Sequence, residues 1–216
     1  YGEMFYIWLF MPWSLKEICP KAYDEDFFPK YNSPDGRVPY NSWGNGSAMR
    51  VSAVGWFFET LEETERVAKI SAEITHNHPE GIKGAQATAA AIWMARNGKS
   101  KADIKEYIET KYEYDLDRTW EYLNQRYGWK SSCQETVPEA IIAFLESSSF
   151  EDAIRKAVSM VGDSDTLACI TGGIAEAFYG EIPEEMILET KRVFPQIFHK
   201  ILDAMKINTA YGKQNK

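Results

Sequence analysis

Apolar residues recur at three- and four-residue steps through most of this chain after about residue 60, which is the period of an α-helix with one buried face. Strand-like alternation of apolar and polar residues is nearly absent. The pattern predicts helices over residues 62–74, 79–96, 100–109, 117–126, 137–146, 150–161 and 183–205. The chain is therefore expected to form an all-α domain, with residues 1–216 as one unit.

Several features of these helices can be predicted in more detail. Val67, Ile70 and Ile74 share one apolar stripe of the first helix, and Thr60 is expected to cap that helix. The helix over residues 79–96 is rich in alanine, and small residues such as Gly84 would let it approach its neighbours closely. Pro138 is expected at the start of its helix, where a missing N–H group costs no hydrogen bond.

Composition limits the class of protein. Residues 20–46 contain four prolines and an Asp-Gly pair, which predicts a long irregular region. No apolar run approaches the roughly 20 residues of a membrane span, and a net charge of −8 argues against direct nucleic-acid binding. The apolar start lacks the basic segment of a signal peptide. Three widely spaced cysteines fit reduced thiols in a cytoplasmic protein.

The most informative segment is residues 162–180, which begins Gly-Asp-Ser-Asp-Thr and continues as an apolar helix. Two carboxylates and a hydroxyl, from Asp163, Asp165 and Thr166, gather where that helix is predicted to begin. Such oxygen ligands suit a hard divalent cation, magnesium or manganese. The alternative is a helix cap, in which Asp163 accepts backbone N–H groups and Asp165 favours the first turn. Cys169 falls on the same helix and is expected in the core.

Two further segments have to be considered together with this one. Residues 41–51 read Asn-Ser-Trp-Gly-Asn-Gly-Ser-Ala-Met-Arg-Val, and residues 75–86 read Thr-His-Asn-His-Pro-Glu-Gly-Ile-Lys-Gly-Ala-Gln. In this order, the three segments resemble the ADP-ribosylglycohydrolase family over roughly residues 38–185. Each motif is unspecific by itself, but the combination is specific. The resemblance implies a compact, orthogonal multi-helix fold of that family's type.

The resemblance also implies an activity, the hydrolysis of a glycosidic bond at C1″ of ADP-ribose in an ADP-ribosylated protein or a small ADP-ribose conjugate. Family enzymes use two magnesium or manganese ions, and half of their ligands lie in an N-terminal Thr-Asp-Asp-Thr run. That run is absent from this sequence, which starts at Tyr1. We therefore expect a piece that lacks an N-terminal segment, with the catalytic acid in that segment, and that is inactive by itself.

Individual residues acquire roles through the same resemblance. The Gly-Asn-Gly turn would lie against the diphosphate of ADP-ribose, because glycines let backbone N–H groups approach phosphate oxygens. A tight turn without a ligand is the alternative. Trp43 could stack on adenine or be a rim or core aromatic residue, and Arg50 is expected to be buried beside a carboxylate. The expected substrate contacts are Trp43, Gly44, Asn45, Gly46, Ser47 and His76, and the expected metal ligands are Asp163, Asp165 and Thr166.

Two other interpretations remain open at this point. The first is a degenerate family member that binds ADP-ribose without hydrolysing it, which the absence of Thr-Asp-Asp-Thr favours if Tyr1 is near the true start. The second is a helical interaction protein with no small ligand, which only the abundance of amphipathic helices supports. The sequence does not indicate which linkage would be cleaved or the oligomeric state.

Overall fold

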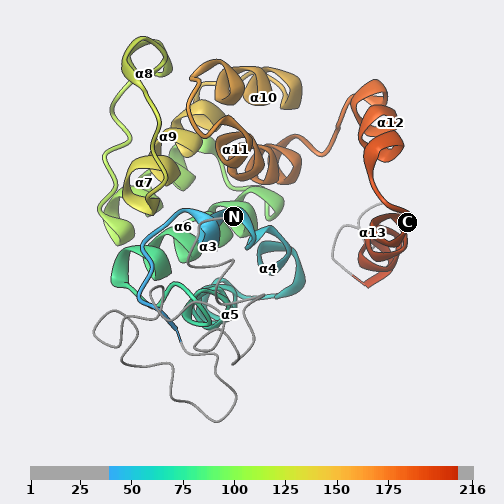
Figure 1. Ribbon diagram of the computed structural model, residues 1–216, viewed down its shortest axis with the longest axis horizontal. Coiled ribbons are helices and arrows are strands. Elements are labelled where there is room, and N and C mark those ends of the chain that lie inside the picture. Colours follow the sequence, from blue (N-terminus) through green and yellow to red (C-terminus); the bar gives the residue numbers. More distant parts are fainter. Residues whose placement is uncertain (1–38, 209–216) are drawn as a thin grey trace, which may run out of the picture.

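The structure is a computed structural model that describes residues 39–208, and within that range it contains α-helices and no strand (Figure 1). The helices are α3 (Gly46–Met49), α4 (Ser52–Phe57), α5 (Leu61–Glu73), α6 (Pro79–Arg96), α7 (Lys101–Tyr112), α8 (Trp120–Arg126), α9 (Cys133–Leu145), α10 (Phe150–Ser159), α11 (Ser164–Tyr179), α12 (Glu184–Val193) and α13 (Gln196–Asn208). The all-α prediction is confirmed. Most of the predicted irregular region lies outside the described residues, and residues 39–45 hold no helix.

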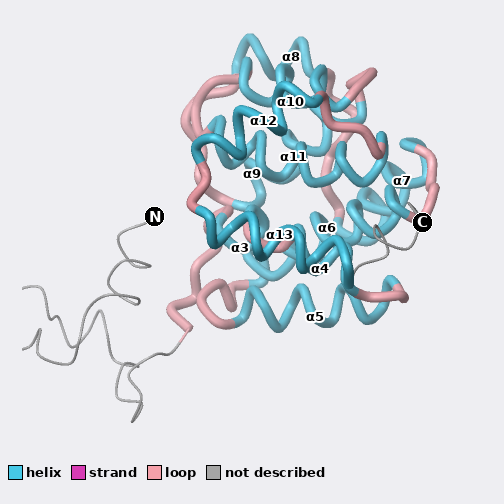
Figure 2. The backbone as a smooth tube through the Cα atoms, turned by 90° about the vertical axis from the view of Figure 1, so that its right-hand side faces the viewer, coloured by secondary structure: helices cyan, strands magenta, loops and turns pink. Residues whose placement is uncertain are grey.

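Helix α6 lies at the centre of the domain, where it packs against α3, α4, α5, α7, α9 and α11 (Figures 1 and 2). All of its alanines are buried, and most of them form the main core together with larger side chains of α9 and α11 such as Phe144, Ile141 and Ile170. Alanine has no side chain beyond Cβ, so six neighbouring helices can approach one axis. The alanine-rich helix predicted over residues 79–96 is thus the central helix of the fold.

Two glycines show how close this approach is. A Cβ added to Gly84 of α6 would lie 2.5 Å from the Cys133 Sγ of α9 and 2.8 Å from its Cβ. A Cβ added to Gly55 of α4 would lie 2.5 Å from Ile92 Cγ2 of α6. Real Cβ atoms do not approach other heavy atoms so closely, so neither position has room for a side chain. The prediction that Gly84 permits close packing is confirmed.

A buried carboxylate ties α5 to α7. Glu65 of α5 accepts hydrogen bonds from the hydroxyl groups of Tyr107 and Tyr112, each at 2.6 Å, and forms an ion pair with Lys111. Burial and the bond to Glu65 raise the pKa of Tyr112 far above its usual value, so this hydroxyl stays protonated and keeps donating. The carboxylate is therefore satisfied although it is shielded from water.

The predicted helix over residues 183–205 is wrong, because the structure contains two helices there. Helix α12 ends before Phe194, whose backbone is extended at φ −81° and ψ 138°. Pro195 follows directly, and a proline disfavours helical geometry in the residue before it. No residue of α12 is buried, and Figure 1 shows α12 and α13 standing apart from the other helices.

The predicted start of the helix over residues 137–146 is also wrong. Helix α9 begins at Cys133 rather than near residue 137, so Pro138 lies inside the helix. A proline at the sixth helical position removes only the bond that its N–H would make to the carbonyl of Gln134, close to the helix start. The buried face of α9, which includes Val137, Ile141 and Phe144, compensates for that loss.

The apolar stripe noted in the sequence of α5 does not form the buried face of that helix. Ile70 and Ile74 are 47% and 53% exposed, and the residues of α5 that are buried include Ala68 and Ala72. The small residues face α6, where the helices approach each other closely. The short helices α3 and α4 were not predicted, because four to six residues are too few to show a helical period.

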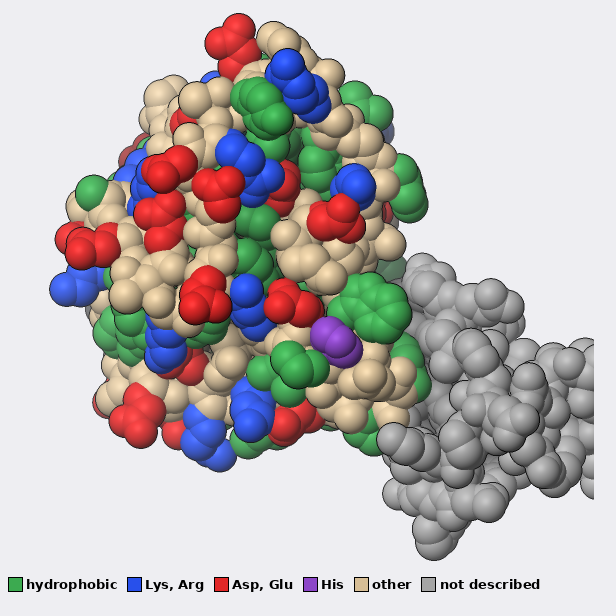
Figure 3. Space-filling model, turned by 90° about the vertical axis from the view of Figure 1, so that its left-hand side faces the viewer, with side chains coloured by type: hydrophobic (Ala, Val, Ile, Leu, Met, Phe, Trp, Pro, Cys, Tyr) green, Lys and Arg blue, Asp and Glu red, His purple; other side chains and the backbone are tan. Residues whose placement is uncertain are grey.

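The described surface carries charges of both signs. On the face shown in Figure 3, acidic and basic side chains are interspersed, with no continuous basic patch. Among the helices of residues 39–208, none combines the length and apolar character needed to cross a bilayer.

The seam between α6 and α9 yields a test of the fold. Replacing Gly84 with alanine should destabilise the protein by about 1–3 kcal/mol because the new methyl group overlaps Cys133. This destabilisation opposes the effect of helix propensity, which by itself favours alanine over glycine within a helix by about 1 kcal/mol. Urea unfolding measures the change. Gly128→Ala is the matched control, since a Cβ there meets nothing within 4 Å, and equal stability of the two variants would contradict the packing argument.

Candidate functional site

The glycine turn (residues 44–46) is held against the loop that leads into α9. Gly44 and Ser132 form an isolated antiparallel bridge. The Asn45 N–H donates to the Ser131 carbonyl at 2.8 Å, and the Cys133 N–H donates to the Trp43 carbonyl at 2.9 Å. The turn therefore has a fixed backbone position next to the start of α9.

The Asn45 side chain joins this turn to the predicted metal ligands. Its Nδ2 group donates to Asp163 Oδ2 at 2.6 Å and to Thr136 Oγ1 at 3.1 Å. Asn45 is only 7% exposed, so both amide hydrogens are committed inside the protein. Three segments that are distant in sequence thus converge on one amide, and two of them are motifs predicted to share a site.

Gly162 shapes the start of α11. Its backbone adopts a φ of +72°, and a Cβ added there would lie 2.7 Å from the Gly128 carbonyl oxygen. Both observations require glycine. The residue after it, Asp163, occupies the N-cap position of α11 but makes no capping hydrogen bond with its side chain. The carboxylate is instead bonded to Asn45, so the helix-cap interpretation does not hold for Asp163.

The three predicted metal ligands lie together at this helix start. Burial raises the pKa of Asp163, and the neighbouring Asp165 carboxyl adds to that rise, while the hydrogen bond from Asn45 lowers it. The Thr166 hydroxyl donates to Met49 Sδ at 3.6 Å, which leaves the lone pairs of its oxygen for another partner. Among the described residues, no group of three or more His, Cys, Asp or Glu is arranged to hold a metal ion.

His76 packs against the glycine turn. Its Nε2 atom lies 3.1 Å from the place where a Cβ on Gly46 would be and 3.6 Å from that on Gly44. On the other side of the ring, Nδ1 shares a hydrogen bond of 2.6 Å with Thr75 Oγ1. The two glycines therefore leave room for the imidazole of His76, which is a packing reason for their presence beside the expected one.

The imidazole of His76 is neutral under ordinary conditions. Burial, with the positive charge of Arg50 as a second cause, lowers its pKa to about 4. Arg50 itself was expected to be buried beside a carboxylate, but it is exposed, and its Nη2 donates to the Ser71 carbonyl and to Thr75 Oγ1, each at 2.9 Å. The expected carboxylate partner is thus replaced by oxygen acceptors at the end of α5.

The remaining predicted substrate contacts differ in their exposure. Trp43 is 53% exposed, and its ring meets the His78 ring edge-on at 5.5 Å between centroids. Ser47 is 1% exposed, and its hydroxyl donates to the Gly81 carbonyl at 2.7 Å. A ligand can reach Trp43, whereas the Ser47 hydroxyl is used within the protein. The predicted contact to Ser47 stays a prediction.

Sequence reasoning missed or misplaced several residues around the site. Cys169 was expected in the core but is exposed, and its thiol donates to the Met49 carbonyl at 3.1 Å. Tyr127 was not singled out, although it lies close enough to Asp163 and Thr136 for both to affect its hydroxyl, whose pKa burial raises to about 12. Gly81 was also missed, and a Cβ there would lie 2.6 Å from the Ser42 carbonyl. No local pattern marks either residue.

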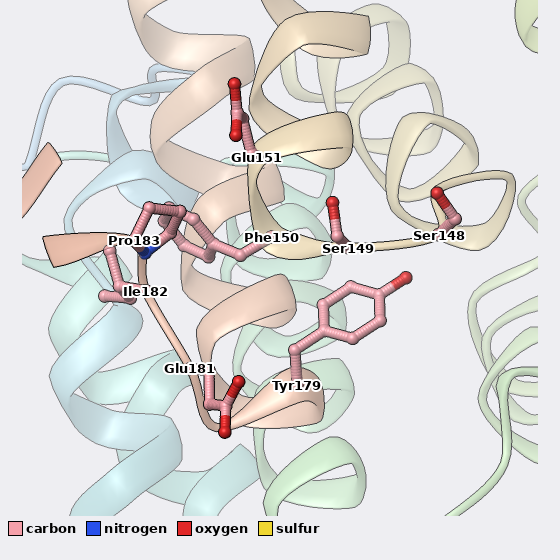
Figure 4. Close-up of a pocket in the computed structure, with 8 residues that line it drawn as sticks. All are labelled: Ser148, Ser149, Phe150, Glu151, Tyr179, Glu181, Ile182 and Pro183. Carbon is pink, nitrogen blue, oxygen red and sulfur yellow. The ribbon is translucent and has the colours of Figure 1, made fainter. Parts of the chain in front are cut away.

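A cavity of about 420 Å³ lies elsewhere (Figure 4). Its lining comes from the start of α10, the end of α11 and the connection to α12: Ser148, Ser149, Phe150, Glu151, Tyr179, Glu181, Ile182 and Pro183. None of the motif residues lines it. We therefore place the candidate site at the start of α11, where the motifs meet.

Comparison with known proteins agrees with the motifs. The model of the ADP-ribosylglycohydrolase family matches residues 13–212. An uncharacterized protein of Archaeoglobus fulgidus is 33% identical over 157 residues, which cover 66% of this chain and 52% of that protein. Human ADP-ribosylhydrolase ARH3 is 27% identical, over 78% of this chain and 58% of its own length. ADP-ribosylarginine hydrolase Tri1 of Pseudomonas putida is 29% identical, over 67% and 41%.

The chain spans about half the length of the curated relatives it matches. A solved structure described as an ADP-ribosylglycohydrolase-related protein complex shares the fold, with a TM-score of 0.57 and 21% identity over 73% of this chain and 58% of that one. The family match covers far more than half of the sequence, and it includes all three motifs. This chain belongs to the ADP-ribosylglycohydrolase family.

Proposed function

We propose that this chain carries part of a site for metal-dependent hydrolysis of the glycosidic bond at C1″ of ADP-ribose, in an ADP-ribosylated protein or a related conjugate. The observation that carries the proposal is the hydrogen bond between Asn45 and Asp163, which joins the glycine turn to the carboxylate pair across 118 residues of sequence. Two relatives are by name hydrolases of ADP-ribosyl groups. Because the chain spans about half of their length, the activity belongs to the proposal.

The residues on the ligand side suit ADP-ribose. A half-exposed Trp43 offers an aromatic face of the kind that stacks on a base. The neutral His76 offers a hydrogen bond without carrying a charge. These groups surround the glycine turn, whose backbone is held by the loop before α9. We infer that the diphosphate and its ribose lie against this turn, and that the distal ribose extends toward Asp163.

The residues at the start of α11 suit magnesium or manganese. The Asp165 carboxyl raises the cost of ionising Asp163, and a divalent cation would relieve that repulsion. Because Asp163 does not cap the helix, its carboxylate retains acceptor capacity beyond the bond from Asn45. Asp163, Asp165 and Thr166 would hold the metal, with further ligands from the family's Thr-Asp-Asp-Thr segment in a protein that contains it. Bound metal would activate a water and stabilise developing negative charge.

Asn45, Thr136 and Gly162 position these ligands. Asn45 fixes one Asp163 oxygen, and Thr136 fixes Asn45 from its other side. The positive φ of Gly162 lets the chain turn into α11 immediately before the carboxylates. A protein that binds ADP-ribose through these residues without hydrolysing it is the alternative.

The glycine turn provides the first test. Asn45→Ala should weaken ADP-ribose binding more than tenfold, or about 1.4 kcal/mol, because the turn loses its link to Asp163. Calorimetry in the presence of magnesium measures the change. Asn97→Ala is the matched control, since Asn97 is an exposed asparagine after α6. A folded Asn45 variant with the parent affinity would remove Asn45 from the site.

The carboxylates provide the second test. One turn of α11 cannot fill the six positions that magnesium prefers, so we expect weak magnesium binding by the 216-residue chain. In a protein where a Thr-Asp-Asp-Thr segment precedes this chain, Asp165→Asn should abolish release of ADP-ribose and leave helicity unchanged. The control is Asp117→Asn, which removes a largely exposed carboxylate in the connection between α7 and α8, where it pairs with Lys105. Hydrolysis at the parent rate by the Asp165 variant would end the metal hypothesis, whereas binding without hydrolysis by the parent would establish the alternative.

The third test follows from the neutral His76. Its pKa of about 4 lies below the ordinary value of 6.5, so the unfolded chain takes up this proton first as the pH falls. The stability that depends on the neutral ring is complete above about pH 7 and is lost toward pH 4, by about 2–3 kcal/mol. Denaturant unfolding of the parent and of His76→Gln at several pH values isolates the contribution of His76 to the pH dependence of stability. Parallel pH profiles would contradict the assignment.

A further inference from the structure

Three residues outside the carboxylate pair form a chain of hydrogen bonds that ends at the glycine turn. Arg50 Nη2 donates to Thr75 Oγ1 at 2.9 Å, and Thr75 Oγ1 lies 2.6 Å from His76 Nδ1. His76 Nε2, on the other side of the ring, faces the glycines of the turn. Thr75 is 1% exposed and His76 is 5% exposed, so water does not compete freely for the central bond.

The hydrogens in this chain can be assigned from the chemistry of the groups. A guanidinium only donates, so Arg50 occupies one lone pair of the Thr75 oxygen. The bond between Thr75 and His76 contains one hydrogen, which comes either from the hydroxyl or from Nδ1. The cationic Arg50 withdraws electron density from the Thr75 oxygen, which makes the hydroxyl a better donor and a poorer acceptor. We therefore assign the hydrogen to Thr75, with Nδ1 of His76 as the acceptor.

The Tyr40 hydroxyl also lies beside Thr75 and is the one described competitor for that hydrogen. An imidazole nitrogen is a much stronger base than the oxygen of a neutral phenol. The neutral ring takes up a proton at about pH 6.5, whereas a phenol already carries its proton below about pH 10 and its oxygen has only weakly basic lone pairs left. The Thr75 hydrogen accordingly goes to His76, and the phenol of Tyr40 can donate to the remaining lone pair of Thr75. The neutral state of His76 agrees with this assignment.

We propose that Arg50 and Thr75 are positioning residues that hold His76 as the Nε2–H tautomer, so that the ring donates a hydrogen bond to an oxygen of ADP-ribose at the glycine turn. In a neutral imidazole only one nitrogen carries hydrogen, and Nδ1 is the acceptor here. No hydrogen bond joins Nε2 to another residue in the described part of the chain, so the N–H on this atom is left for a ligand. A ligand oxygen at the turn satisfies it. The identity of the ligand rests on the proposed function, whereas the assignment of the tautomer does not.

The tautomer can be measured without any ligand. The chain has three histidines, so ¹⁵N-labelled imidazole signals can be assigned with His78→Gln and His199→Gln. We expect His76 to show a protonated Nε2 and an unprotonated Nδ1 at pH 7. Thr75→Val, which keeps the shape and removes the hydroxyl, should give a mixture of tautomers, and Thr75→Ser should restore the parent spectrum. A parent spectrum with hydrogen on Nδ1, or an unchanged spectrum for Thr75→Val, would overturn the proposal.

Binding provides the second measurement. Thr75→Val should lower the affinity for ADP-ribose about fivefold, the effect of one hydrogen bond, and Thr75→Ser should stay within about twofold of the parent. Equal affinity of all three proteins would overturn the role toward the ligand. A parent protein that binds no ADP-ribose would refute the proposed function, and the imidazole spectrum would still decide the tautomer. The parent spectrum decides it even if Thr75→Val fails to fold.

Discussion

The close approach of helices to α6 is the constraint on which the rest of the structure depends. The turn that carries Asn45 leads into α3, Thr136 lies on α9, and the carboxylates open α11, and all three helices pack against α6. Because a Cβ on Gly84 would overlap Cys133 at the start of α9, the separation of these helices is set by the smallest side chains. The hydrogen bonds from Asn45 to Thr136 and Asp163 connect segments of these closely packed helices.

The position of Asp163 shows how a local preference is overridden. An aspartate at a helix N-cap normally accepts backbone N–H groups of the first turn, but here the carboxylate is drawn to the Asn45 amide instead. The first turn of α11 is left without that cap, and two carboxylates remain close together. An arrangement that is unfavourable for a helix alone is what a cation site requires, because acceptor oxygens must stay available.

The sequence predicted the parts of this structure that have a long regular pattern. The apolar helix predicted within residues 162–180 is an example: its sixteen residues repeat one helical period, and Leu167, Ile170 and Ile174 are buried in α11. The apolar stripe that contains Ile70 is not the buried face of α5, because small residues such as Ala68 meet α6 instead. The bond between Asn45 and Asp163 crosses 118 residues, and only the family resemblance suggested that these motifs meet. Contacts such as Arg50 with Thr75 leave no local pattern.

Helix α12, which buries none of its residues, has a consequence for how the molecule opens. A segment without buried side chains can unfold while the core stays intact, so its amide hydrogens exchange with solvent through local fluctuations. The amides in the middle of α6, among side chains that are wholly buried, exchange only when the surrounding helices separate. The two helices thus differ in opening free energy, and α6 reports the stability of the whole domain while α12 reports only its own.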